Sequence, residues 1–180
     1  ENFINFYNIG CLFFDLGRIN QAYFFFKKSN KLNPKDNRTL LNLSLCKLSL
    51  KDFKKGFELF EYRWKKNEIE KKKFQYIASP KNIDQVVNKR ILIWDEQGLG
   101  DTINFSRFAI DLLKFTSKIT LVVNKKLKDI LINLHPKILV IDYDNLKQQK
   151  FDFQSSICSL PKLLRISSEK DINYFKLSLE

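Results

Sequence analysis

The chain contains no methionine, one histidine and only three cysteines among its 180 residues. Without methionine, Glu1 cannot be the translational start, so we expect a piece of a longer protein. Cys11, Cys46 and Cys158 are widely spaced, with neither a CxxC motif nor a histidine partner, which argues against a metal site. We expect them to be small buried apolar residues in a reducing compartment.

Long apolar runs and a secretory signal are also missing. No apolar run approaches the roughly 20 residues that a membrane-spanning helix needs. Residues 1–14 begin with an acid, where a signal peptide carries a basic region. These absences predict no membrane span and a cytoplasmic location.

Positive charge, by contrast, is in excess, with a formal net charge of +12. The excess comes mostly from lysines scattered along the chain, with short runs at Lys71–Lys73 and Lys125–Lys126. Such runs are typical of solvated faces, so we predict no nucleic-acid partner. A phosphate-binding stripe is the alternative interpretation.

The most informative segment is Arg90–Phe108, which reads RILIWDEQGLGDTINFSRF. An apolar strand expected at Ile91–Trp94 leads into a loop with two glycines, and helical periodicity follows from Asp101. Open α/β folds place ligands where a strand turns into a helix at the carboxyl edge of the sheet. The glycines let a ligand approach the backbone, and Asp101 or Thr102 can cap the helix.

The loop differs from the common phosphate-binding motifs. The dinucleotide-binding fingerprint needs a third glycine at the position of Ile103. A P-loop ends in Gly-Lys-Ser or Gly-Lys-Thr. Here Gly100 is followed by Asp101, whose charge repels phosphate. We therefore expect no plain nucleotide binding on this loop. A purely structural turn, with Asp101 as its capping residue, stays open as an alternative.

The first third of the chain contains two helix-pair units with an offset of thirty-four residues. Gly10 aligns with Ser44 and Ala22 with Gly56, small residues where two antiparallel helices would approach closely. Pro34 ends the first unit, because proline cannot continue a helix. The unit resembles a tetratricopeptide repeat, whose period it shares.

Two such units cannot bury their stacking faces alone, so we expect further repeats upstream. The functional interpretation of the array is a groove that binds a peptide or protein partner. The alternative is a spacer that packs against the following domain.

The second part of the chain alternates strands and helices, which predicts parallel, right-handed βαβ units. The fold class is therefore α + α/β. We expect tetratricopeptide helices over residues 1–66, a linker over 67–89 and a truncated Rossmann-like domain over 90–180. The expected strands are residues 91–94, 119–123, 138–141 and 151–154.

This combination resembles bacterial tetratricopeptide proteins that carry a glycosyltransferase domain similar to heptosyltransferases and, more distantly, to O-linked N-acetylglucosamine transferases. The family's loop reads Trp-Gly-Glu-Gln-Gly-Leu-Gly-Asp-Thr. Residues 94–102 keep it except at Asp95, which replaces a glycine. Asp152-Phe153 and Ser159–Pro161 match a second landmark, with Gln154 where a histidine is common.

The resemblance implies a GT-B fold, of which this chain holds the amino-terminal, acceptor-side half. The nucleotide-sugar donor is then bound mainly by a carboxyl-terminal domain outside these residues. The acceptor is a hydroxyl of a protein or glycan, and Asp101 takes the role of general base. No metal and no other cofactor is required. The loop residues expected to contact substrate are Gln97, Gly98, Leu99, Gly100 and Thr102.

The predicted function is transfer of a sugar from a nucleotide-sugar to a hydroxyl acceptor, with the repeats binding a partner or the acceptor. Because the donor-binding half lies outside the chain, we expect the fragment alone to be inactive. The alternative is a non-catalytic tetratricopeptide scaffold protein.

Overall fold

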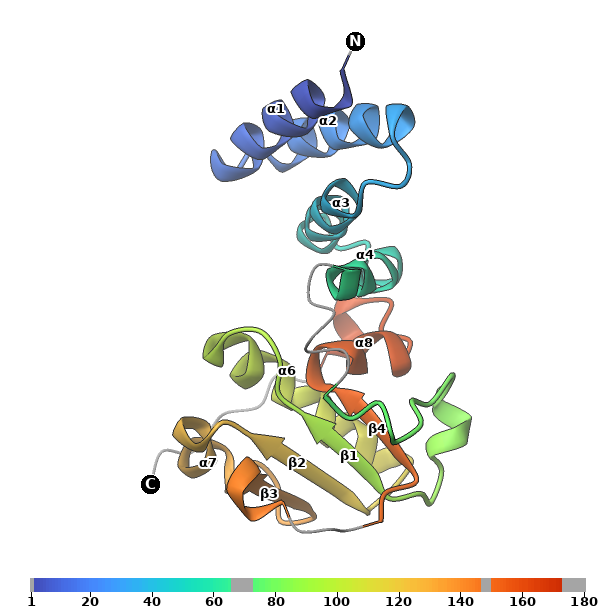
Figure 1. The fold of residues 1–180 in the computed structure, drawn as a ribbon, viewed down its shortest axis with the longest axis vertical. Helices are drawn as coiled ribbons and strands as arrows, with labels where there is room; N and C mark the ends of the chain where they lie inside the picture. Colours follow the sequence, from blue (N-terminus) through green and yellow to red (C-terminus); the bar gives the residue numbers. More distant parts are fainter. Residues whose placement is uncertain (1, 66–72, 147–149, 173–180) are drawn as a thin grey trace. The chain divides into compact units, whose positions relative to one another are not determined.

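A computed structural model describes residues 2–65, 73–146 and 150–172 of the chain (Figure 1). The chain divides into two compact units. The first comprises Glu1–Lys72 together with Ile166–Asp171, and the second comprises Lys73–Arg165 together with Ile172–Glu180.

The described part of the first unit consists of two helical hairpins. α3 begins thirty-four residues after α1, at Asn37 against Phe3, and α4 begins thirty-four residues after α2, at Phe53 against Ile19. The predicted repeat period is thus confirmed in the helix positions. The elements are α1 (Phe3–Asp15), α2 (Ile19–Leu32), α3 (Asn37–Ser49), α4 (Phe53–Phe60) and the 3-10 helix η1 (Glu61–Lys65).

Small residues let the helices of each hairpin approach closely, as the sequence predicts. A Cβ atom at Gly10 of α1 would lie 2.6 Å from the Phe26 ring of α2. Ala22 and Phe26 are fully buried in the core of the first unit. In the second hairpin, a Cβ at Gly56 of α4 would lie 2.6 Å from the Leu48 side chain of α3.

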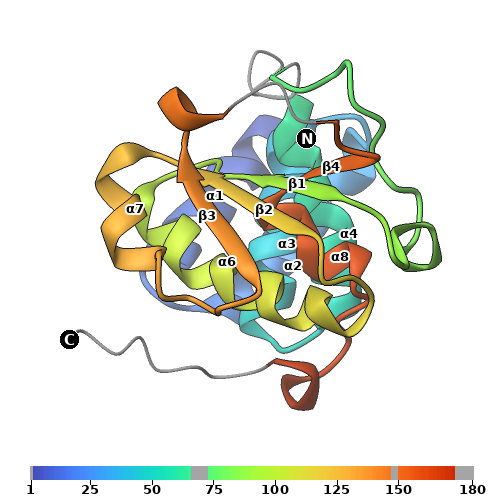
Figure 2. The same ribbon diagram turned by 90° about the horizontal axis from the view of Figure 1, so that it is seen from below.

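The second unit is built on a four-stranded sheet with the order β3-β2-β1-β4, all strands parallel. Its helices α6 and α7 contact each other and cover the same side of the sheet, as right-handed crossovers require (Figure 2). The whole chain is therefore of the α + α/β class. The elements are β1 (Ile91–Trp94), α6 (Leu99–Asp111), β2 (Ile119–Val123), α7 (Lys125–Leu131), β3 (Ile138–Asp142), β4 (Phe153–Ser156) and α8 (Leu160–Leu163).

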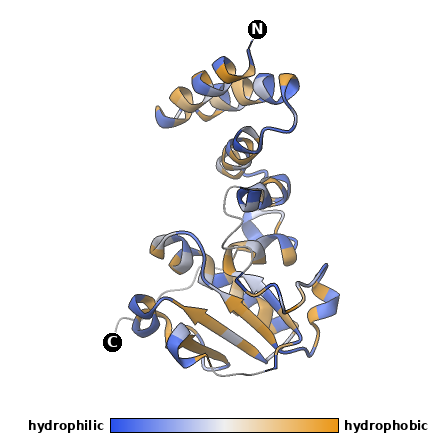
Figure 3. Cartoon of the chain, viewed as in Figure 1, coloured by the Kyte–Doolittle hydropathy of each residue, from blue (hydrophilic) through white to orange (hydrophobic). Residues whose placement is uncertain are grey.

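Strands β1 and β2 are buried along their whole length, which explains their continuous apolar sequences. Figure 3 shows these strands as the most hydrophobic part of the sheet. Ahead of β1, Phe74, Ile83 and Val86 are buried too, and the Phe74 ring packs on Trp94 with centroids 5.9 Å apart. Within the described ranges, no helix is both long and apolar enough to cross a bilayer.

Several boundaries differ from the sequence-based prediction, and two of the differences bear on the candidate site. Helix α6 begins at Leu99, with Gly98 as its N-cap, and not at Asp101. Strand β4 runs from Phe153 to Ser156, two residues later than expected. Both errors have a physical cause: Gly100 has a low helix propensity although it lies in the first turn of α6, and the buried end of β4 is polar and lacks an apolar pattern.

Candidate functional site

The carboxyl ends of all four strands meet at one edge of the sheet, because the strands are parallel. From β1 the chain proceeds to β2 and β3 on one side and then returns to β4 on the other. The topological switch point therefore lies between β1 and β4, where open α/β folds bind ligands. The loop Asp95–Gly98 leaves β1 at this point.

Glu96 connects this loop to β4 across the switch point. Its side chain is only 4% exposed, and its Oε1 accepts a hydrogen bond from the hydroxyl of Ser156, the last residue of β4. The Ser156 hydroxyl also lies 3.4 Å from that of Ser159. Because Glu96 is buried and engaged, its role in the site is to hold the loop in position.

Asp95 connects the ends of three strands. Its Oδ2 accepts a 2.6 Å hydrogen bond from the backbone N–H of Asn124, which follows β2. Its Oδ1 accepts a hydrogen bond from the hydroxyl of Tyr143, which follows β3, and lies 3.8 Å from Lys73 Nζ. Asp95 is thus a structural tie of the carboxyl edge.

Asp101, the predicted base, is exposed in the first turn of α6. Its Oδ2 accepts a hydrogen bond from the Gly98 N–H at 3.2 Å, so it caps the helix from the third helical position. Its other oxygen, Oδ1, makes no hydrogen bond to any residue that the structure describes. One carboxylate oxygen therefore holds the helix start, and the other is accessible from solvent.

The remaining predicted site residues fall into two groups. Gln97, Gly98, Leu99 and Gly100 are exposed around Asp101. Thr102 is only 1% exposed, and its hydroxyl is directed toward the carbonyl oxygens of Gly98 at 3.3 Å and Glu96 at 3.4 Å. The structure thus gathers the first four on the surface and places Thr102 inside the turn.

Packing does not require either glycine of the loop. A Cβ at Gly100 would meet no atom within 4 Å, and one at Gly98 would meet only Asp101 Oδ2 at 3.5 Å. Gly98 has a φ of −80°, which any residue adopts. The left-handed φ in this loop, 63°, belongs to Gln97. These glycines leave open surface beside Asp101.

Sequence reasoning missed the contacts that brace the switch point. The Trp94 indole N–H donates to Gln154 Oε1 at 2.6 Å, and the Gln154 amide donates to Ser79 Oγ at 2.7 Å. Gln154 and Ser156 are buried polar residues on β4. The polar residues at the end of β4 were the only sign of these contacts in the sequence. Their hydrogen-bond partners lie 60 or more residues away along the chain.

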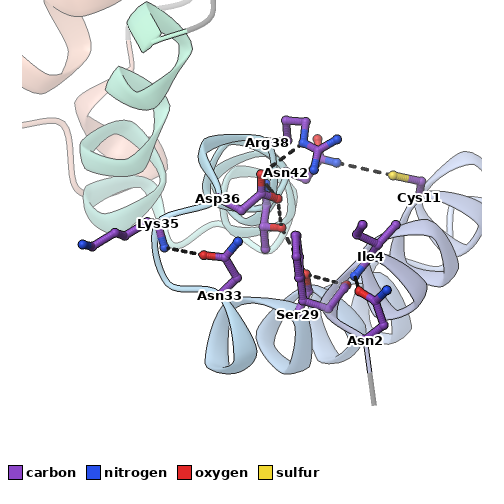
Figure 4. A network of polar contacts seen from close by, with 11 residues as sticks. Asn2, Ile4, Cys11, Ser29, Asn33, Lys35, Asp36, Arg38 and Asn42 are labelled. Carbon is purple, nitrogen blue, oxygen red and sulfur yellow. Dashed lines mark hydrogen bonds and ion pairs between the residues drawn. The ribbon is translucent and has the colours of Figure 1, made fainter.

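The first helices of the two repeats carry a second group of polar side chains (Figure 4). The Arg38 guanidinium of α3 lies 5.1 Å from the centre of the Tyr7 ring of α1, and Asn42 donates to Cys11 Sγ at 3.5 Å. Burial, with a smaller contribution from the Cys11 thiol, raises the pKa of Tyr7. We call these four residues the repeat surface; it offers a partner a cation, a phenol and an amide.

The sequence model of the tetratricopeptide repeat matches residues 5–36, which span most of α1, the turn and all of α2. No curated protein and no solved structure matches the chain. The match supports a role for the helical repeats in binding protein partners.

Proposed function

We propose that the protein is the acceptor-side part of a heptosyltransferase-like glycosyltransferase, in which the repeats bind a partner or the acceptor. Residues 1–66 form the repeat part, 67–89 the linker and 90–180 the acceptor-side domain of a cytoplasmic enzyme. The observation that carries the proposal is the exposed carboxylate of Asp101 beside two glycines that packing does not require. It lies at the switch point of a parallel sheet, the usual ligand position of such folds.

In the proposed reaction, Asp101 takes the proton from an acceptor hydroxyl as that oxygen attacks the anomeric carbon of a nucleotide-sugar. The bond from that carbon to the diphosphate breaks, and the diphosphate leaves from the opposite face. A positioned base contributes roughly 10²–10⁴-fold to the rate. Orientation of the two substrates and stabilisation of the leaving group supply the rest.

The other loop residues have separate roles in this proposal. Gln97, Gly98, Leu99 and Gly100 contact the acceptor, since they are exposed and the glycines permit close approach. Thr102 acts as a positioning residue, because its hydroxyl is directed toward loop carbonyls and is buried.

The test is sugar transfer by the intact protein that carries this chain, with the variant Asp101→Asn. Asparagine keeps an oxygen that can accept the Gly98 N–H, so the fold is retained, but it cannot accept the acceptor's proton. We expect transfer to fall about 10²–10⁴-fold at an unchanged unfolding temperature. The matched control is Asp129→Asn, which removes an exposed charge from α7 and leaves the rate unchanged.

Transfer by Asp101→Asn at the parent rate would show that Asp101 is not the base. An intact protein that neither hydrolyses nor transfers from any nucleotide-sugar would overturn the enzyme proposal as a whole.

A non-catalytic scaffold is the second candidate, and the tetratricopeptide match supports the partner binding that both candidates require. In that case Asp101→Asn alters nothing measurable, whereas Arg38→Gln on the repeat surface weakens partner binding. Measuring sugar transfer and partner binding for both variants therefore distinguishes the two functions.

A further inference from the structure

A hollow of about 660 Å³ lies in the second unit at the amino edge of the sheet. This edge is the opposite end of the strands from Asp101, so the hollow is separate from the site of the proposed transferase reaction. Its volume falls within the range of about 300–1,000 Å³ that is typical of small-molecule sites.

Four cations line the hollow, and each belongs to the segment that leads into a different strand. Arg90 precedes β1, Lys118 precedes β2, Lys137 precedes β3 and Lys150 precedes β4. Because the strands are parallel, these segments meet at one edge. No acidic residue is among the lining residues.

The cations are largely unneutralised by the protein itself. Lys118, Lys137 and Lys150 are exposed and form no ion pair with any residue in the described ranges. Arg90 is the exception, with its Nε 3.7 Å from Asp152 Oδ2. Gathering like charges is unfavourable for the compact state, and a bound anion would offset that repulsion.

The hollow also has an apolar part. Ile119 and Ile138 are buried beneath it, Leu139 is 50% exposed, and Phe151 is half-buried. The exposed leucine on β3 and the phenylalanine ahead of β4 each offer contact to an apolar group. The lining therefore combines positive charge for a phosphate with apolar surface for the organic part of the same molecule.

We propose that this hollow binds a small organic phosphate of mononucleotide size. Its phosphate lies among the lysines, and its organic part lies against Phe151. The four cations line one hollow of small-molecule size, which favours a small ligand over a nucleic-acid strand.

The test is calorimetric titration of the full chain with ADP as the probe. The double variant Lys118→Gln, Lys137→Gln should weaken ADP binding about tenfold or more, because two charge-assisted contacts are lost. The control Lys54→Gln, Lys55→Gln removes the same charge from α4 of the first unit and should leave the affinity within about twofold. Asp101→Asn should also leave it unchanged.

Two further arms identify the ligand class. ADP should bind more tightly than inorganic phosphate, and Phe151→Ala should remove that preference while sparing the unfolding temperature. The proposal is overturned if ADP does not bind at millimolar concentration, or if both double variants weaken binding equally. It is also overturned if a single-stranded oligonucleotide binds more tightly than ADP, with the steep salt dependence of a nucleic-acid surface.

Discussion

Gly100 is a residue whose identity the fold does not explain. It is the second residue of α6, and a Cβ there would meet no atom within 4 Å. Glycine inside a helix costs about 1 kcal/mol relative to alanine. We expect Gly100→Ala to raise the free energy of unfolding by up to about 1 kcal/mol, measured by urea denaturation, and to impair transfer by the intact protein.

Gly10→Ala is the matched contrast, because there a Cβ would lie 2.6 Å from the Phe26 ring in the core. Overpacking of this kind costs about 1–3 kcal/mol. A loss of stability in Gly100→Ala would contradict the assignment of Gly100 to ligand access. No loss in Gly10→Ala would contradict the close packing of Gly10 against Phe26.

Asp95 lends itself to a second prediction at the same scale. Its carboxylate accepts hydrogen bonds from Asn124 and Tyr143, and Asp95→Gly deletes both. We expect the free energy of unfolding to fall by about 1–3 kcal/mol. Tyr143→Phe should lose part of this, and the pair of changes should be less than additive. Full additivity in a double-mutant cycle would show that Asp95 and Tyr143 do not stabilise the fold through a common hydrogen bond.

At the scale of the element, the two helices of the second repeat begin at aspartates, α3 at Asp36 and α4 at Asp52. Asp36 caps α3: its Oδ2 accepts from the Thr39 N–H at 3.2 Å, and Arg38 lies beside it at 3.0 Å. Burial acts to raise the pKa of Asp36, but the hydrogen bonds from Thr39 and Arg38 outweigh burial and lower it from 3.8. The charged form is therefore favoured by folding.

This lowered pKa predicts a pH dependence of stability. Since the folded-state pKa of Asp36 lies below its unfolded value, its contribution is complete above about pH 4 and is lost as the pH falls through the folded pKa. Asp36→Asn keeps a capping oxygen but not the charge, so it should lose this contribution at pH 7 and should flatten the decline below about pH 4, read from unfolding temperatures. An unchanged acid profile, equal to that of Asp129→Asn, would refute this.

Elements defined by local pattern were predictable from the sequence, and those defined by distant partners were not. The apolar runs of β1 and β2 announce buried parallel strands, and their bounds are as predicted. β4 was displaced because Gln154 and Ser156 are polar yet buried, satisfied by Trp94 and Glu96. No local pattern carries that information.

The same division applies to the candidate site. The sequence identified the loop and its exposed residues, because glycines between a strand and a helix are a local signal. It placed Thr102 among the contact residues, although the structure buries its hydroxyl. It also did not predict that Asp95 joins the ends of β2 and β3, since this depends on the order of the strands.

At the scale of the whole molecule, the three cysteines report separately on the two units. Cys46 is fully buried in the first unit, and burial raises the pKa of its thiol to about 11. Cys158 is 1% exposed in the second unit, and Cys11 is half-buried. We expect iodoacetamide at pH 8 to label Cys11 first, followed by mass spectrometry of the peptides.

Cys46 and Cys158 should become labelled only at urea concentrations that unfold their own unit. Labelling of Cys46 at the rate of Cys11 without denaturant would contradict the packing of the first unit.

Gln97 has a left-handed backbone conformation, with φ of 63°, so selection for stability and selection for activity should favour different residues at this position. A residue with a side chain is held there at a cost of about 1 kcal/mol, which glycine would avoid. A library randomised at position 97 and screened only for thermal stability should be enriched in glycine. A library screened for sugar transfer by the intact protein should keep the Gln97 side chain. The residue recovered at position 97 would therefore show whether stability or activity determines it.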